Sequence, residues 1–157
     1  MLAKYVNKKQ LCCFSTFEEQ LNHHHPLYIL ANRIDWSIFE KAFSPLFSNN
    51  GRPAKPIRLM VSLILLKHIR NISDETVVEQ WEENSYYQYF SGKQMFACGQ
   101  PCDASELVHF RKRIGAWGTE LILKESIHIN INEKDSKEDK ATRDTTVQEK
   151  KYYLSYG

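Results

Sequence analysis

The chain has 157 residues, of which 21 are Lys or Arg and 19 are Asp or Glu, so its formal net charge is +2. A hydrophobic share of 42% and a charged share of 25% are typical of one soluble globular domain, and they exclude collagen-like and wholly disordered proteins. The longest largely apolar run, residues 60–66, is far shorter than the roughly 20 residues of a membrane span, and the N-terminus has no apolar signal segment. We therefore expect a cytoplasmic protein with no membrane partner and with its four cysteines reduced.

Residues 1–24 are mostly polar and predict a loosely held arm with one short helix. From residue 26 to 47, apolar residues recur at steps of three and four, which predicts two helices, the second capped by Asp35. The three histidines at 23–25 are weighed as metal ligands, but consecutive residues point in three directions, so an exposed loop is favoured. Residues 48–53 form a loop by their turn chemistry.

The next stretch predicts a hairpin of two helices. Pro56 suits a first helical position, and one apolar stripe follows it: Ile57, Met60, Val61, Ile64, Leu65 and Ile69. Residues 71–73 form a turn, and Ser73 caps an acidic helix whose inward residues are Val77, Val78 and Trp81. Residues 52–70 hold five cations and no acid, whereas residues 74–83 hold five acids and no Lys or Arg. The pair resembles a helix-turn-helix, with an ordinary helical hairpin as the alternative.

Two further clusters are ambiguous. Four aromatic residues crowd positions 86–90 and could stack on bases, but such clusters more often pack in a core, which we favour. Cys98 and Cys102, followed by His109, have a spacing within the range of zinc ligands. A closed zinc site needs four ligands and no supporting pair follows, so we expect packing cysteines and no metal.

A short helix begins at Asp103, which forms a capping box with Glu106, and it ends at Gly115. Its buried stripe comprises Leu107, Phe110 and Ile114, and its opposite face comprises Ser105, His109, Lys112 and Arg113. Such a face offers cations to phosphates and hydrogen-bonding groups to base edges in the major groove. Basic residues in a last turn also stabilise the helix dipole, so the pattern alone leaves both interpretations open.

A last helix spans residues 119–131 and is apolar enough for core or partner contacts. Residues 132–140 carry seven charges in nine positions and predict a solvated linker at a domain boundary. Residues 144–148 have the β-branched content of a strand start.

From about residue 25 to 131 the chain resembles the N-terminal domain of DDE-type insertion-sequence transposases. The matching stretches are His25–Leu27, Ile34–Trp36, Gly51–Met60, Ser73–Trp81 and Phe110–Gly115. The resemblance implies a compact all-α domain that helps to bind the terminal inverted repeats of the element as double-stranded DNA. The predicted contacts are Ser105, His109, Arg111, Lys112 and Arg113, with Arg58, Lys67 and Arg70 as supporting phosphate contacts.

In that family a catalytic domain follows, and its first strand carries the first of three metal-binding carboxylates. Here Asp144 matches that carboxylate in the run Asp144–Lys150. Such chemistry needs three carboxylates holding two divalent ions, for which Mg²⁺ is suited. Residues 151–157 depart from the family's pattern, and we hypothesise a one-nucleotide frameshift that leaves residues 141–157 as a frayed strand remnant. The expectation is a truncated transposase fragment that binds no Mg²⁺ cofactor and is inactive alone.

An alternative is a protein-interaction module. The apolar face of residues 119–131 could pair with a second copy or with full-length transposase, and such a mixed dimer would inhibit transposition. A small zinc protein and a non-functional remnant are the weaker alternatives.

Overall fold

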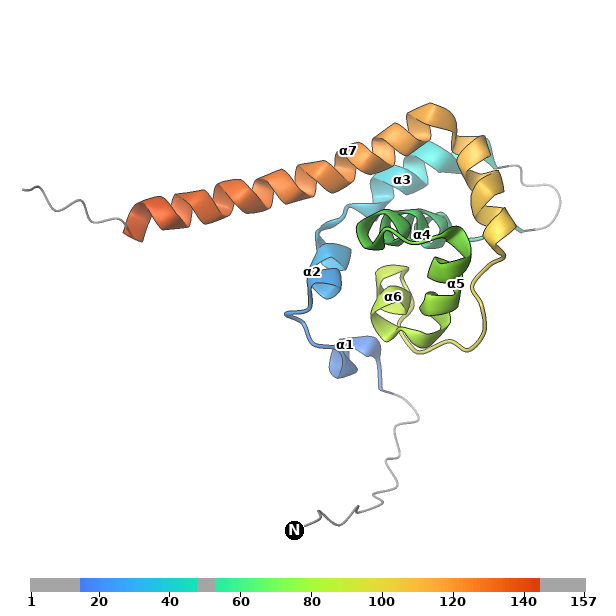
Figure 1. Cartoon of the computed structure of the whole chain (residues 1–157), viewed down its shortest axis with the longest axis horizontal. Helices are drawn as coiled ribbons and strands as arrows, with labels where there is room; N and C mark the ends of the chain where they lie inside the picture. Colours follow the sequence, from blue (N-terminus) through green and yellow to red (C-terminus); the bar gives the residue numbers. More distant parts are fainter. Residues whose placement is uncertain (1–14, 48–52, 145–157) are drawn as a thin grey trace, which may run out of the picture.

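In the computed structural model, residues 15–47 and 53–144 are described. These ranges form seven α-helices and one short 3₁₀ helix, with no strand among them, which confirms the predicted all-α fold (Figure 1). Within the described residues, no helix is both long enough and apolar enough to cross a membrane.

The N-terminal helices are short and lie at one side of the domain. α1 spans Phe17–Gln20, α2 spans Pro26–Arg33, α3 spans Trp36–Phe43, and the 3₁₀ helix η1 spans Ser44–Leu46. Asp35 caps α3 as the sequence predicts, because its side chain accepts a hydrogen bond from the Ser37 N–H at 3.0 Å.

The predicted hairpin is present. α4 spans Ile57–Arg70, α5 spans Asp74–Glu83, and α6 follows at Ser85–Phe90. Asn71 closes α4 in the left-handed conformation at φ 52°, and Ser73 caps α5 by accepting from the Thr76 N–H at 3.1 Å. Pro56 is the N-cap of α4 and not its first helical residue, so the helix begins one residue later than predicted.

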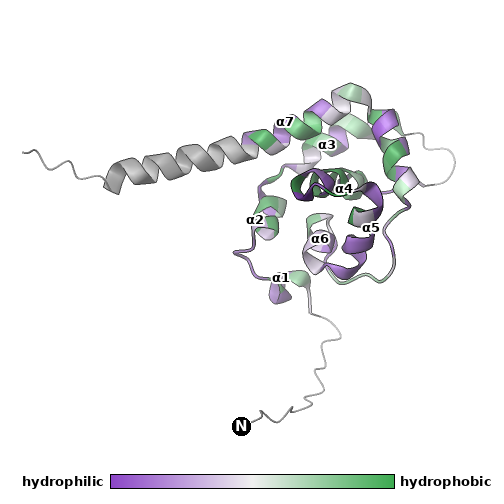
Figure 2. Cartoon of the chain, in the orientation of Figure 1, coloured by the Kyte–Doolittle hydropathy of each residue, from purple (hydrophilic) through white to green (hydrophobic). Residues whose placement is uncertain are grey.

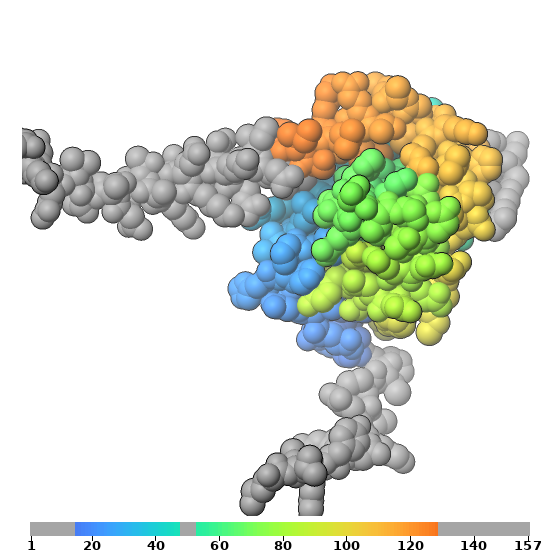
Figure 3. Space-filling view, in the orientation of Figure 1, coloured from blue at the N-terminus to red at the C-terminus, as the bar shows by residue number. Residues whose placement is uncertain are grey.

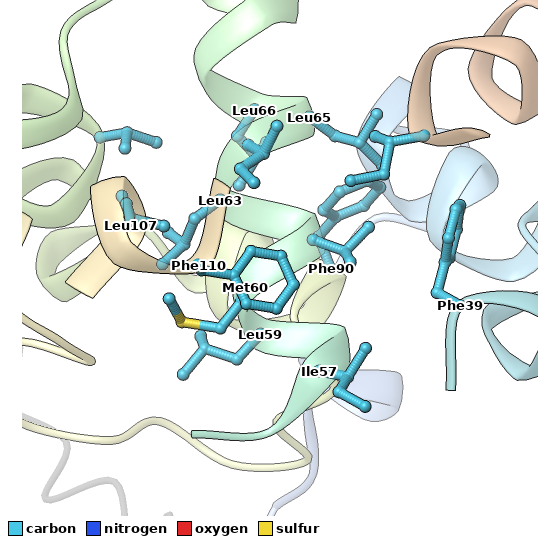
Figure 4. Close-up of a cluster of buried hydrophobic side chains, with 14 of the residues drawn as sticks. Phe39, Ile57, Leu59, Met60, Leu63, Leu65, Leu66, Phe90, Leu107 and Phe110 are labelled. Carbon is cyan, nitrogen blue, oxygen red and sulfur yellow. The ribbon is translucent and has the colours of Figure 1, made fainter. Parts of the chain in front are cut away.

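α4 is the centre of the core. Between Ile57 and Leu66 every residue except Arg58 is buried, and α4 packs against α3, α5 and α7 (Figure 4). Five of the six residues of the predicted apolar stripe are buried, as predicted, but the buried surface extends around the helix, because α4 is covered on more than one side. Ile69, placed in the stripe, is 48% exposed on the last turn.

The aromatic cluster belongs to the core, as predicted. Tyr87 and Phe90 of α6 are 3% and 0% exposed. Tyr86 and Tyr89 are half-buried where α2 packs on α6, and their hydroxyl groups bond to Asn22 and Asn32 of the N-terminal segment.

α7 spans Ala104–Asp144 and is interrupted at Gly115, where φ is 65° and ψ is −169°. At its start, the Ser105 N–H donates to Asp103 and the Asp103 N–H donates to Glu106, which confirms the capping box. Gly115 thus ends the first arm of α7, residues 104–114, and a second arm continues in a new direction (Figure 1).

The second arm remains helical through residues 132–140, where the sequence predicts a solvated linker. Glu, Lys and Ala are strong helix formers, and interspersed opposite charges support a helix, so high charge did not prevent helix formation here. Asp144 ends α7 in helical conformation instead of opening a strand, and residues 145–157 lie outside the described part of the chain.

Candidate nucleic-acid interface

The first arm of α7 turns one side to the core and the other to solvent. Leu107, Phe110 and Ile114 are 0%, 4% and 4% exposed, as predicted. The opposite side, which we call the outer face, consists of four exposed predicted contact residues: Ser105, His109, Lys112 and Arg113. This arm lies at one edge of the described part of the molecule (Figure 3).

Arg113 is held in place by an aromatic ring. Its guanidinium carbon lies 4.8 Å from the centre of the Phe47 ring, which in turn stacks on Phe110 with 6.1 Å between ring centres. A hollow of about 210 Å³ opens beside this stack, and Lys55 and His109 also line it. The structure therefore brings three basic side chains, the side chain of Glu106 and an aromatic ring together at one end of the outer face.

Arg111 and Lys67 point elsewhere. The Arg111 guanidinium donates to both oxygens of Asp74, at 2.8 and 2.6 Å, and Lys67 Nζ donates to the same carboxylate at 2.9 Å. The hydrogen bond from Arg111, together with the one from Lys67, lowers the pKa of Asp74 to about 2. Burial acts in the opposite direction but is outweighed. These two predicted DNA contacts therefore join α4 and α7 to the start of α5.

Arg58 is also engaged within the fold. Its guanidinium carbon lies 4.7 Å from the centre of the Trp36 ring, and its Nε donates to the Phe90 carbonyl at 3.4 Å. The side chain is half-buried, and this burial lowers the pKa of the guanidinium from its ordinary value. Arg70, by contrast, is exposed at the end of α4.

The hairpin itself presents acids to solvent. Glu75, Glu79 and Glu83 are exposed on α5, which is largely hydrophilic in Figure 2. Ser105 lines a hollow together with Glu75 and Glu79, so one edge of the outer face is acidic. Because these carboxylates repel phosphates, electrostatics favour the first arm of α7 over α5 as the helix that faces nucleic acid.

A comparison with known protein families finds a match. A family model described as "Transposase domain (DUF772)" matches residues 15–113, which include every described helix up to the first arm of α7. The chain belongs to this transposase-domain family.

A curated relative of the transposase domain is the "Uncharacterized protein ORF8 in nfe locus" of Rhizobium meliloti. It is 42% identical over 133 residues, which cover 83% of this chain and 64% of that protein. The chain thus spans less than two-thirds of the relative's length. No solved structure matches the chain.

Two residues near the outer face of the transposase domain were not among the predicted contacts. Lys55 lines the hollow beside Arg113 and donates from Nζ to the Pro101 carbonyl at 2.8 Å. Phe47 supplies the ring under Arg113. Lys55 belongs to the basic stretch 52–70 and could have been found from that signal, whereas the position of Phe47 depends on tertiary packing.

The candidate metal ligands of the transposase domain do not converge. In the described ranges no group of three or more His, Cys, Asp and Glu side chains gathers at one point. Cys98 is exposed, and Cys102 is buried, which raises the pKa of its thiol to about 11. His25 caps α2 and stacks on Tyr86 with 3.8 Å between ring centres, so it has a structural role.

Proposed function

We propose that the transposase domain binds double-stranded DNA at the terminal inverted repeats of an insertion sequence through the outer face of α7. The observation that carries the proposal is the exposure of Lys112, Arg113 and His109 on one side of a capped, well-anchored helix. Family membership supports it, because the match runs to residue 113 and so includes this face.

The side chains divide by chemistry. Lys112 and Arg113 are permanent cations suited to phosphates, and Arg70 at the end of α4 supplies a third. His109 and Ser105 carry short hydrogen-bonding groups that suit base edges. Arg111 and Lys67 are assigned instead to the fold, because each already forms an ion pair with Asp74.

We expect the polypeptide of residues 1–157 to bind DNA without cutting it and without a Mg²⁺ cofactor. DDE chemistry needs three carboxylates around two ions, and within these 157 residues the resemblance matches the first alone, Asp144. Incubation of the polypeptide with supercoiled DNA carrying the repeat and Mg²⁺ should leave the DNA intact. Nicking at the repeat would contradict this expectation.

The test of DNA binding is a salt titration. As three phosphate contacts, Lys112, Arg113 and Arg70 should together contribute about −3 to the slope of log K against log salt, since each contact contributes about −0.9. Replacing Lys112 or Arg113 by Ala should reduce the slope by about 1, whereas Lys41→Ala, at an exposed lysine of α3, should leave it unchanged. Equal slopes for all variants would remove the outer face from consideration.

A second candidate function has its own observation. On the second arm of α7, Trp117, Leu123 and Ile127 are 59%, 38% and 54% exposed. Exposed apolar side chains of this size are typical of protein contacts, so this arm is a candidate for pairing with a second copy or with full-length transposase, which would inhibit transposition. Salt-insensitive dimers in sedimentation experiments, abolished by Ile127→Lys, would favour this function.

A further inference from the structure

Another hollow has Lys55 among its lining residues, as does the hollow beside Arg113. It measures about 470 Å³, and three basic residues line it: Lys55, Arg58 and Lys93. No Asp or Glu is among its lining residues. Glu82 lies next to this lining, because its carboxylate accepts a hydrogen bond from the backbone N–H of Gly99, a lining residue. We call this space the Arg58 hollow.

Arg58 is a half-buried cation of this hollow, and an anion bound there would stabilise its charge. Trp36 covers its guanidinium on one side and the Phe90 carbonyl accepts from Nε, but no acceptor for the two Nη groups occurs in the described part of the chain. Within the described residues, one ring and one carbonyl therefore replace only part of the hydration that this half-buried cation loses. Burial accordingly lowers the pKa of the guanidinium.

The backbone is shaped around this side chain. Gly92 has a φ of +93°, and a Cβ at this position would lie 3.0 Å from both Cδ and Nε of Arg58. A side chain at position 92 would therefore be strained and would push Arg58 from its place over Trp36. Glycine at position 92 thus leaves the Arg58 stem the room that it occupies at the wall of the hollow.

The hollow adjoins the outer face. Lys55 lines both the Arg58 hollow and the smaller hollow that contains His109 and Arg113. Lys55 is therefore shared between a hollow lined by His109, Arg113 and Glu106 and a hollow lined by Arg58 and Lys93. Spaced cations along a surface are the arrangement that follows the phosphates of a DNA strand.

We infer that the Arg58 hollow is a phosphate-binding site, in which Arg58 and Lys93 hold a backbone phosphate of the DNA strand that crosses the outer face of α7. Arg58 supplies a planar guanidinium whose Nη groups can donate to a phosphate, and the exposed Lys93 supplies an ammonium. The inference rests on the proposed DNA binding for the source of the phosphate, while the shared chemistry also suits free inorganic phosphate.

The central test compares Lys93→Ala with Lys41→Ala in salt titrations with a duplex from the terminal repeat. Lys93 is exposed, so its removal should leave the fold intact. We expect Lys93→Ala to reduce the slope by about 1 and the affinity about 5- to 10-fold at 0.1 M salt, with no change for Lys41→Ala. Arg58→Gln should act in the same direction, and if that variant fails to fold, Lys93→Ala decides.

The variants separate this inference from the proposed function. A slope that falls for Lys112→Ala but not for Lys93→Ala would overturn the inference and leave the proposed function standing. A slope unaffected by either change would overturn both. Calorimetry with inorganic phosphate distinguishes the two sources of phosphate. If Lys93→Ala abolishes the binding of inorganic phosphate but leaves the DNA slope unchanged, the hollow binds phosphate and the DNA strand is not its source.

Discussion

Single charged side chains in this domain have different roles although the sequence lists them together. Arg111, Lys112 and Arg113 are consecutive, yet Arg111 binds Asp74 of α5 whereas Lys112 and Arg113 are exposed to solvent. One residue along a helix is a rotation of about 100°, which is enough to move a side chain from the outer face to the interface between helices. Their contributions to stability and to DNA binding should therefore separate experimentally.

Arg111→Ala should destabilise the domain without changing its DNA contacts. The change leaves the largely buried Asp74 with Lys67 alone, and we expect a loss of about 1–3 kcal/mol in the free energy of unfolding. Urea denaturation measures the loss, and the salt slope of DNA binding should equal that of the unchanged domain. A reduced slope with unchanged stability would return Arg111 to the phosphate contacts.

The Asp74 cluster also predicts a loss of stability in acid. The pKa of Asp74 is about 2 in the folded domain and is lowered from an ordinary value of 3.8, so folding favours the charged form. The resulting stabilisation, about 2 kcal/mol, is complete above the unfolded-state pKa and is lost as the pH falls through about 2. Asp74→Asn should remove this dependence, and urea denaturation at pH 5 and pH 2 measures the difference. Parallel curves for the two proteins would contradict it.

Gln88 is a polar core residue whose side chain fixes the loop after α6. It is fully buried, its amide nitrogen donates to the carbonyls of Trp81, Glu82 and Ala97, and its oxygen accepts from the Ala97 N–H. Gln88→Leu leaves these backbone groups without partners, and we expect a loss of about 2–4 kcal/mol in thermal or urea unfolding. A stability equal to that of the unchanged domain would show that water replaces the side chain.

At the scale of helices, the bend at Gly115 divides α7 into two arms with different surroundings. Its first arm packs on α4 and exposes the outer face, and its second arm departs with Trp117 and Ile127 exposed. The backbone at φ 65° and ψ −169° is in a region that residues with a Cβ rarely occupy. The change of direction between the arms therefore depends on this single glycine.

Gly115→Ala should accordingly lower the free energy of unfolding by about 1–3 kcal/mol, through backbone strain alone. A Cβ at this position meets no other atom within 4 Å, so a steric clash does not contribute. Chemical denaturation measures the loss. An unchanged or higher midpoint would mean that the helix adopts another conformation at this position in solution.

Helix boundaries could be predicted from the sequence because capping is local. Asp35, Ser73 and Asp103 each bond to N–H groups two or three residues ahead, which is a distance visible in the chain itself. The partners of the cations could not be predicted in the same way. Arg111 and Asp74 are 37 positions apart, and their contact depends on how α7 crosses α5.

Part of the candidate site could also be predicted from the sequence, and part could not. The face of Ser105, His109, Lys112 and Arg113 follows from helical periodicity, and the structure shows these four residues exposed. The Arg58 hollow could not be foreseen, since Lys55, Arg58 and Lys93 come from three segments. The run of charges at 132–140 predicted a linker because a highly charged segment is expected to be solvated. Charge content alone does not indicate whether a solvated segment is helical, and this one is.

For the whole molecule, charge separates onto different sides. The solvent side of α5 carries Glu75, Glu79 and Glu83, while cations extend from the first arm of α7 toward Lys55 and the Arg58 hollow. A net charge of +2 conceals this separation, and under the proposed DNA binding the separation would orient the domain on the polyanion. The acidic side should face away from DNA.

The most direct measurement is the salt dependence of binding to a duplex of the terminal repeat for the unchanged domain and for Lys112→Ala/Arg113→Ala. We predict that the double change reduces the slope of log K against log salt by about 2 while the urea midpoint stays the same. An undiminished slope in a folded double variant would contradict DNA binding through the outer face of α7.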